Sequence, residues 1–254
     1  MNRAYFSGIK QPDERIHALP HQVTAGTAIG ILVLDLWYPY FPGNVANAST
    51  FSFPVMYHLL EGVDDQVLDV DALVLDKIIE GGKKLQRHGV RAIIGACGYF
   101  GNYQRAAAQA LDQPVFLSSL LQVPMILSAL KPQQKVGIIC AVKDAFTPYL
   151  LNQCGVTDPD SVVVVGAQDS VEFQNSLLYK GHLNSAIVER DLVLLASDLV
   201  KTHPEIGALL LECSDLPIYA SAIQNAVGLP VFDYITMINW VQQAVVCRPY
   251  AGFM

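Results

Sequence analysis

The sequence predicts an α/β fold of two pseudo-symmetric lobes, each with a parallel sheet flanked by helices, and an active site in the cleft between the lobes. Three observations support this prediction: short unbroken apolar runs, helical periodicity between those runs, and a partial internal repeat. Unbroken apolar runs are typical of parallel strands that are covered on both faces. Their alternation with helical segments indicates an α/β architecture.

Five short aliphatic runs are interpreted as buried strands. In chain order they cover residues 29–34, 90–94, 136–139, 162–165 and 206–211. Between them, apolar residues recur at helical spacing, as in the segments 75–85 and 188–199. A further helical pattern follows Phe232, and we expect this tail to return and pack against the first lobe.

The internal repeat joins a strand, a cysteine, a helical segment and a second strand. The first copy runs from RAIIGAC (91–97) to LDQPVF (111–116), and the second from ALLLEC (208–213) to VGLPVF (227–232). In both copies 17 positions separate the cysteine, Cys97 or Cys213, from the proline, Pro114 or Pro230. Two such units predict lobes related by a pseudo-dyad.

The repeat also predicts the domain boundaries. Residues 29–130 together with 231–254 form the first lobe, which carries Cys97, and residues 131–230 form the second lobe, which carries Cys213. The turn at 131–134 is interpreted as the crossover between the lobes. Residues 1–28 are interpreted as an N-terminal extension.

Composition excludes several classes of function. The chain of 254 residues has a net charge of −7 and no block rich in Lys or Arg, which argues against a nucleic-acid partner. No apolar run reaches the roughly 18–20 residues that span a bilayer, and the first 28 residues lack the apolar core of a signal peptide. We therefore expect a cytoplasmic protein that does not act on membranes. Whether the chain forms a homo-oligomer stays open.

The sequence predicts no cofactor and no metal site. Its six His residues show no metal-ligand spacing, and no glycine-rich phosphate loop is present. Five cysteines without a secretion signal argue against a disulfide framework, so each cysteine is considered alone. Cys140, Cys154 and Cys247 are interpreted as structural residues.

Cys97 and Cys213 both follow strands and precede helical segments. Ligands of α/β sheets bind at the carboxyl ends of strands, where a helix N-terminus also attracts anions and lowers the pKa of a thiol. A cysteine is usually a small buried hydrophobe, but the repeated position favours function here. Two thiols on opposite lobes supply the base and the acid that inversion next to a carboxylate requires.

Three segments, PGNVANAST (42–50), GACGYFG (95–101) and LECSDLP (211–217), resemble the aspartate/glutamate/hydantoin racemase superfamily. The resemblance covers roughly residues 28–245. It implies a cofactor-independent racemase or epimerase of an amino acid or related carboxylic acid, which uses neither pyridoxal phosphate nor metal. It also implies that Cys97 and Cys213 are the two bases and that the partner is a small carboxylate substrate.

The resemblance implies further residues near the substrate. Asp35, at the end of the first strand, matches a carboxylate near the site, although it could equally cap the strand. In the following loop, Asn47, Ser49 and Thr50 are expected to donate hydrogen bonds to the substrate, or else to cap the next helix. Beside the cysteines, the backbone of Gly98 and the hydroxyl of Ser214 are expected to bind the substrate's carboxylate.

Two acidic residues flank the second cysteine. Glu212 is interpreted as a residue behind the site or as a buried carboxylate with its own hydrogen-bond partners. Asp215 is expected to cap a helix, with the binding of an ammonium group as the alternative. The residues after Cys97 and Cys213 differ from those of better-known members, which often have Asn-Thr and Thr there, so the resemblance does not point to aspartate or glutamate as the substrate.

Other activities stay open on the same fold. A maleate isomerase-like enzyme would use a thiol as nucleophile, and an arylmalonate decarboxylase-like enzyme would need only one of the two thiols. A non-catalytic module that binds a small acid is the alternative from a different class. The presence of both thiols favours an enzyme.

Overall fold

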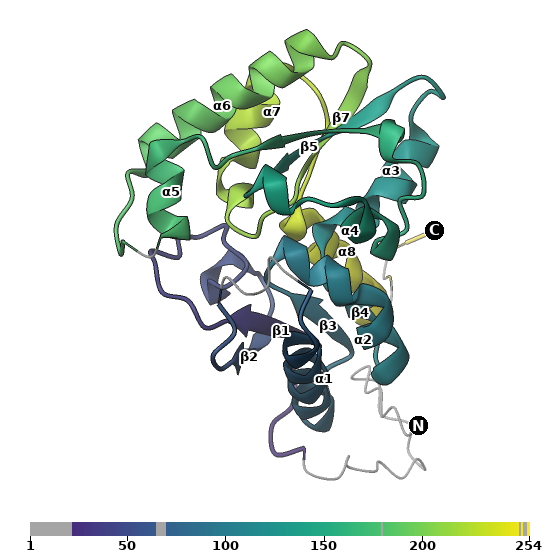
Figure 1. Ribbon diagram of the computed structural model, residues 1–254. Coiled ribbons are helices and arrows are strands. Elements are labelled where there is room, and N and C mark those ends of the chain that lie inside the picture. Colours follow the sequence, from purple (N-terminus) through teal and green to yellow (C-terminus); the bar gives the residue numbers. More distant parts are fainter. Residues whose placement is uncertain (1–21, 65–69, 179, 249, 251–252) are drawn as a thin grey trace.

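The computed structural model describes residues 22–64, 70–178, 180–248, 250 and 253–254. Most of the N-terminal extension predicted for residues 1–28 lies outside the described residues. Two four-stranded parallel sheets form the centres of two lobes, which lie one above the other in Figure 1. The α/β fold with two lobes of parallel sheet is therefore confirmed.

The two sheets have the same strand order. The first is β2-β1-β3-β4 and the second is β6-β5-β7-β8. Their strands are β1 (Ile29–Leu34), β2 (Val55–Leu60), β3 (Ala92–Gly95), β4 (Val115–Phe116), β5 (Lys135–Cys140), β6 (Val162–Gly166), β7 (Ile206–Leu211) and β8 (Val231–Phe232). This equivalence confirms the pseudo-symmetry that the repeated strand–cysteine–helix–strand pattern predicts.

Helices cover both sheets. They are α1 (Ala72–Arg87), α2 (Gln104–Ala110), α3 (Val123–Ala129), α4 (Pro148–Gln153), α5 (Val171–Leu177), α6 (Ser185–Thr202), α7 (Ala220–Val227) and α8 (Tyr234–Val245). In α1 the residues Val74, Ile78 and Leu85 are buried at helical spacing, and in α6 the residues Val188 and Leu192 are. The predicted helical segments thus bury the faces that their periodicity indicates.

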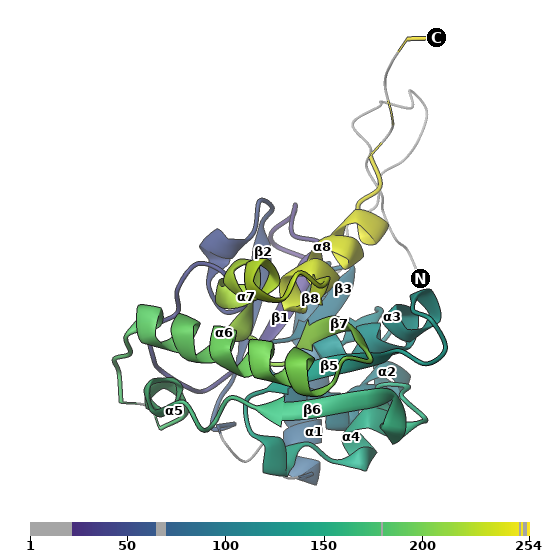
Figure 2. The same cartoon turned by 90° about the horizontal axis from the view of Figure 1, so that it is seen from above.

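The C-terminal helix α8 joins the first lobe, as expected. Its buried residues Tyr234, Met237, Ile238 and Val241 pack in one cluster with β1 and β3, and α8 lies close to β3 in Figure 2. Strand β8 pairs with β7, so the second sheet extends two residues beyond the boundary predicted at residue 230. Among the described residues, no helix is both long and apolar enough to cross a bilayer.

Candidate active site

Both candidate thiols lie at the carboxyl ends of inner strands. Cys97 follows β3 in the first lobe, and Cys213 follows β7 in the second. Both line a single cavity of about 400 Å³ to which the two lobes contribute. The sequence repeat therefore brings the two cysteines together at the sheet edge where α/β proteins bind ligands.

Hydrogen bonds between the lobes fix the backbone around both cysteines. The hydroxyl of Ser214, beside Cys213, donates to the carbonyl oxygen of Ala96, beside Cys97, over 3.0 Å. The backbone N–H of Val45 donates to the carbonyl oxygen of Ser214 over 3.3 Å. The hydroxyl of Ser119, also in the first lobe, donates to the carbonyl oxygen of Leu211 over 3.1 Å. These contacts join the backbone segments that carry the two thiols.

Asp215 is a buried carboxylate in the cavity wall, held by residues of the other lobe. Its Oδ1 accepts hydrogen bonds from the hydroxyl of Tyr38 over 3.0 Å and from Nδ2 of Asn44 over 2.5 Å. Burial raises the pKa of Asp215 to about 6, although these bonds and one from the Cys213 thiol oppose the rise. Asp215 therefore carries a negative charge at neutral pH. Its side chain makes no helix cap, so the expected capping role is wrong.

Glu212 is fully buried beside the two thiols and also belongs to the cavity wall. Its Oε2 accepts one hydrogen bond, from the backbone N–H of Ala141 over 3.3 Å. Among the described residues, Oε1 has no hydrogen-bond partner, so the interpretation of Glu212 as a fully bonded carboxylate is wrong. Burial raises the pKa of Glu212 to about 8, which keeps most of this group protonated at neutral pH.

The charged side chains that line the cavity are all acidic. Three of its lining residues are acidic, namely Asp64, Glu212 and Asp215, and no Lys, Arg or His is found among the described lining residues. Most of the remaining surface is apolar, with Leu34, Leu36 and Val142 as examples. Such a cavity favours a ligand that carries a positive charge, because a dicarboxylate would meet no cation inside it.

The unliganded thiols are protonated, contrary to the expectation that helix N-termini would lower their pKa. Burial raises the pKa of Cys97, and Glu212 raises it further; the backbone N–H groups of Tyr99 and Phe100 lower it by less. Burial likewise raises the pKa of Cys213, with Asp215 and Glu212 adding to the effect. The helix-end donors are present at Cys97, but desolvation outweighs them.

The structure brings two of the six expected substrate-binding residues into the cavity. Gly98 and Ser214 line it. Asp35 is exposed outside the cavity, where its carboxylate accepts the backbone N–H of Gly62 over 2.8 Å. The strand-end cap that was the alternative for Asp35 is therefore its observed role.

Asn47, Ser49 and Thr50 are also outside the cavity and build the loop after β1. Asn47 caps a short 3-10 helix, Ala48–Thr50, by accepting the backbone N–H of Ser49. The hydroxyl of Thr50 donates to the carbonyl oxygen of Asn44 over 2.7 Å. The capping alternative thus applies to this cluster, which orients Asn44 toward Asp215.

Tyr38 and Asn44 are site residues that the sequence did not reveal as such. Both belong to the loop after β1; Tyr38 lies in none of the quoted segments, and Asn44 lies in the segment 42–50 without being singled out there. They reach the second lobe through Asp215, 177 and 171 positions away. The polar composition of the loop was a signal for a role near the substrate, but only the fold identifies which of its residues face the cavity.

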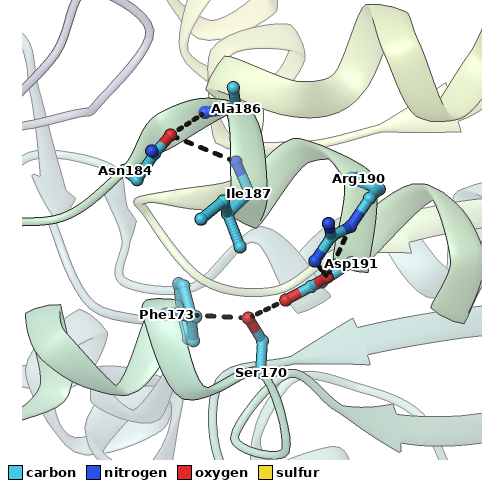
Figure 3. A network of polar contacts seen from close by, with 7 residues as sticks. All are labelled: Ser170, Phe173, Asn184, Ala186, Ile187, Arg190 and Asp191. Atoms are coloured by element: carbon cyan, nitrogen blue, oxygen red, sulfur yellow. Dashed lines mark hydrogen bonds and ion pairs between the residues drawn. The ribbon is translucent and has the colours of Figure 1, made fainter.

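Helix α5 closes one side of the cavity with Gln174, Ser176 and Leu177. Figure 3 shows how α5 is tied to α6: Ser170 caps α5 and donates its hydroxyl proton to Asp191 over 2.8 Å. Arg190 bonds the other oxygen of Asp191 over 2.9 Å, and Asn184 caps the start of α6. The caps orient both helices, which keeps this wall of the cavity in place.

Gly98 allows the two lobes to approach each other at the site. A Cβ at this position would lie 1.8 Å from Oε1 of Glu212 and 2.7 Å from its carbonyl oxygen. We expect Gly98→Ala to lower the free energy of unfolding by about 1–3 kcal/mol, the usual cost of overpacking. Urea denaturation measures the loss.

A double-mutant cycle tests the cause of this loss. With Glu212→Ala present, the methyl group that Gly98→Ala introduces would meet only the backbone oxygen, so the second substitution should cost clearly less than it does in the wild type. Strictly additive losses would contradict the proposed collision with the Glu212 carboxyl group.

The described residues contain no group of three or more His, Cys, Asp or Glu side chains that could hold a metal ion. The two thiols and two buried carboxyl groups of the cavity can act as acids, bases and hydrogen-bond partners.

Comparisons with known proteins identify two kinds of relatives. No family model matches the chain. By sequence, the chain is 31% identical to dimethylsulfoniopropionate lyase 3 of Emiliania huxleyi (strain CCMP1516) over 89% of this chain and 61% of that protein. It is 29% identical to the dimethylsulfoniopropionate lyase of Durusdinium sp. clade D over 89% of this chain and 77% of that protein. The chain thus spans about three fifths of the length of the first relative.

By structure, the chain resembles unliganded arylmalonate decarboxylase with a TM-score of 0.56 and 16% identity, over 86% of this chain and 92% of that one. Glutamate racemase from Francisella tularensis subsp. tularensis SCHU S4 gives a TM-score of 0.51 and 18% identity, over 89% and 85%. At such identities the likeness concerns the fold alone. The fold that the sequence resemblance implies is thereby confirmed: the chain shares the two-lobed fold of arylmalonate decarboxylase and glutamate racemase.

Proposed function

We propose that the chain is a lyase that eliminates a sulfonium group from a small carboxylate, with dimethylsulfoniopropionate as the first substrate to test. The observation that carries the proposal is the charge of the cavity, where two thiols lie beside acidic residues and no cationic side chain is found among the described lining residues. A sulfonium carboxylate brings the missing positive charge. The names of the relatives in Emiliania huxleyi and Durusdinium support the same substrate.

The groups in the cavity account for every proton and electron pair of the elimination. A thiolate removes the proton from the carbon next to the carboxylate, and that C–H electron pair forms the new carbon–carbon double bond. The bond from the next carbon to sulfur breaks, and sulfur keeps its electron pair. The products are dimethyl sulfide, acrylate and a protonated thiol, which returns its proton to solvent. No electron donor or acceptor is needed.

Cys97 is the proposed base. Two backbone N–H groups, those of Tyr99 and Phe100, stabilise its thiolate. One such bond is found for Cys213, from the backbone N–H of Asp215, and the Cys213 thiol donates a hydrogen bond to the Asp215 carboxylate. Burial disfavours either thiolate in this cavity. A bound sulfonium group lowers the pKa of a nearby thiol, because an opposite charge stabilises the thiolate. Deprotonation of Cys97 is thus coupled to the binding of the cationic substrate.

Asp215 is the proposed partner of the sulfonium group. It is ionised at neutral pH and held by Tyr38 and Asn44. The sulfonium charge disappears as the C–S bond breaks, so Asp215 contributes to substrate binding more than to the chemical step.

Racemisation of an amino acid or related acid is the second candidate. The observation that favours it is the presence of both thiols in one cavity, since an elimination needs only one base. A decarboxylase-like reaction or simple binding of a small acid draws less support from this observation, because neither calls for two thiols in one cavity.

Incubation of the purified protein with dimethylsulfoniopropionate in D₂O tests the proposal. We expect release of dimethyl sulfide, measured by gas chromatography, together with an equal amount of acrylate, measured by NMR. The same protein is incubated with separate L- and D-amino acids and hydantoins. Inversion with deuterium exchange at Cα, without release of sulfide from the sulfonium substrate, would replace the lyase with the racemase.

A further inference from the structure

Glu212 combines full burial with an unused oxygen atom. Its side chain is 0% exposed, and the only hydrogen bond found for it among the described residues leads to Oε2, from the backbone of Ala141. Oε1 has no partner among those residues, although the group belongs to the wall of the cavity. A buried polar atom without a partner costs free energy, so its persistence in a cavity wall points to a ligand.

The surroundings of Glu212 disfavour its charge. The titratable groups that interact with it are acids on every neighbouring element: Cys97, Tyr99, Cys140, Cys154, Cys213, Asp215 and Tyr234. Lys, Arg and His are absent from this set of described groups. A second negative charge next to Asp215 is unfavourable, so Glu212 exists as a neutral carboxylic acid at neutral pH.

A carboxylate ligand has few donors to choose from in this cavity. No cationic side chain is found among the described lining residues, and the hydroxyl of Ser214 is already used by Ala96. The neutral side chains of Gln168 and Ser176 also line the cavity. A protonated carboxyl group supplies a stronger donor, since its O–H bonds a carboxylate oxygen strongly. Neutral carboxyl groups in apolar sites act as hydrogen-bond donors in this way.

We propose that Glu212 binds the carboxylate of the substrate as a neutral acid, donating its proton through the oxygen that has no other partner. The substrate class rests on the proposed function, whereas the role of Glu212 requires only that the ligand be a carboxylate. The ionised Asp215 then attracts the cationic end of the ligand, and the neutral Glu212 binds the anionic end.

This role fixes the sign of a pH effect. Below a pKa of about 8 Glu212 donates its proton, and above it the ionised group repels the ligand's carboxylate. Affinity should therefore fall as pH rises above 8, approaching a tenfold loss for each further pH unit. Asp215 titrates near pH 6, and burial holds both thiols of the free protein protonated well above pH 9.5. Between pH 7 and 9.5, Glu212 is therefore the group whose titration changes the affinity for the ligand's carboxylate.

Two matched probes test the proposal by calorimetry. The first is 3-(trimethylammonio)propionate, which carries a cation and a carboxylate, and the second is propyltrimethylammonium, which carries only the cation. Between pH 7 and 9.5 we expect the affinity of the first to fall about tenfold or more, and that of the second to stay level or rise. At pH 8.5 the first probe should take up more protons on binding than the second, because any proton released from Cys97 by the cationic group is common to both probes.

The variant Glu212→Gln supplies an amide donor that does not titrate. We expect it to bind the first probe with an affinity that is flat from pH 7 to 9.5. Asp215→Asn is the matched control: it should bind both probes more weakly and keep the alkaline loss for the first.

Three results would overturn the assignment: identical pH profiles for the two probes on the wild type, an unchanged alkaline loss in Glu212→Gln, or no binding of the first probe at any pH. The wild-type comparison needs no variant to fold. An absence of sulfide release together with the predicted pH profiles would reject the lyase and retain the carboxylate site.

Discussion

Cys97→Ser should lower kcat/KM for the elimination by about 10³-fold, the usual contribution of a positioned general base. Serine keeps the size of the side chain but, with its much higher pKa, yields almost no alkoxide at neutral pH. Cys213→Ser should cost about tenfold or less, because sulfide leaves as a neutral group that needs no acid. The asymmetry between the two variants is therefore the signature of an elimination with a single base.

Steady-state release of dimethyl sulfide measures both variants. Cys247→Ser is the matched control, because this cysteine is exposed and lies outside the cavity; its activity should equal that of the wild type. Inversion of an amino acid by the wild type, reduced 10³-fold or more in both site variants, would instead support two-base racemisation. A large loss in Cys213→Ser alone would move the base to the second lobe.

The fold was accessible from the sequence because its elements repeat and bury regular faces. The equal distance from cysteine to proline in both halves anticipated two sheets of identical order. Strand β2 was not predicted: it lies at the edge of its sheet and mixes Tyr57 and His58 into an apolar segment. These polar side chains interrupt the unbroken apolar run by which the inner strands, and the edge strand β6, are recognised.

The sequence predicted correctly only those site residues that belong to the internal repeat or directly follow its cysteines. Cys97, Gly98, Cys213 and Ser214 stand at equivalent strand ends and share one cavity. Assigning the correct residues of the loop after β1 required knowledge of side-chain direction, and there Asn44 faces Asp215 while Asn47 caps a turn. The balance between desolvation and helix-end donors at the thiols also depends on burial, which no local motif encodes.

Asp215→Asn should raise KM for the sulfonium substrate about 10- to 100-fold and change kcat much less. Asparagine keeps an oxygen for the bonds from Tyr38 and Asn44 but removes the charge that attracts the sulfonium group. That attraction weakens as the C–S bond breaks, so its loss affects binding of the ground state more than the transition state. The expected change corresponds to about 1.4–2.8 kcal/mol of binding free energy.

An isosteric pair of ligands separates charge from shape. The zwitterion 3-(trimethylammonio)propionate and the anion 4,4-dimethylpentanoate share the carboxylate and differ only in a charged nitrogen or an uncharged carbon at the branch point. The wild type should prefer the ligand with the cationic group about 10- to 100-fold at pH 7.5, and Asp215→Asn should lose this preference. Equal preference in both proteins would exclude Asp215 as the partner of the cation.

Tyr38→Phe refines this test, because it removes a hydrogen bond and leaves the Asp215 charge in place. The bond from Tyr38 lowers the pKa of Asp215 against the effect of burial, which raises it to about 6. Without the bond the carboxyl group should ionise at higher pH. The preference for the cation should then appear at higher pH than in the wild type and match it at pH 8.5. A preference equally reduced at every pH would mean that Tyr38 contacts the cation directly through its ring.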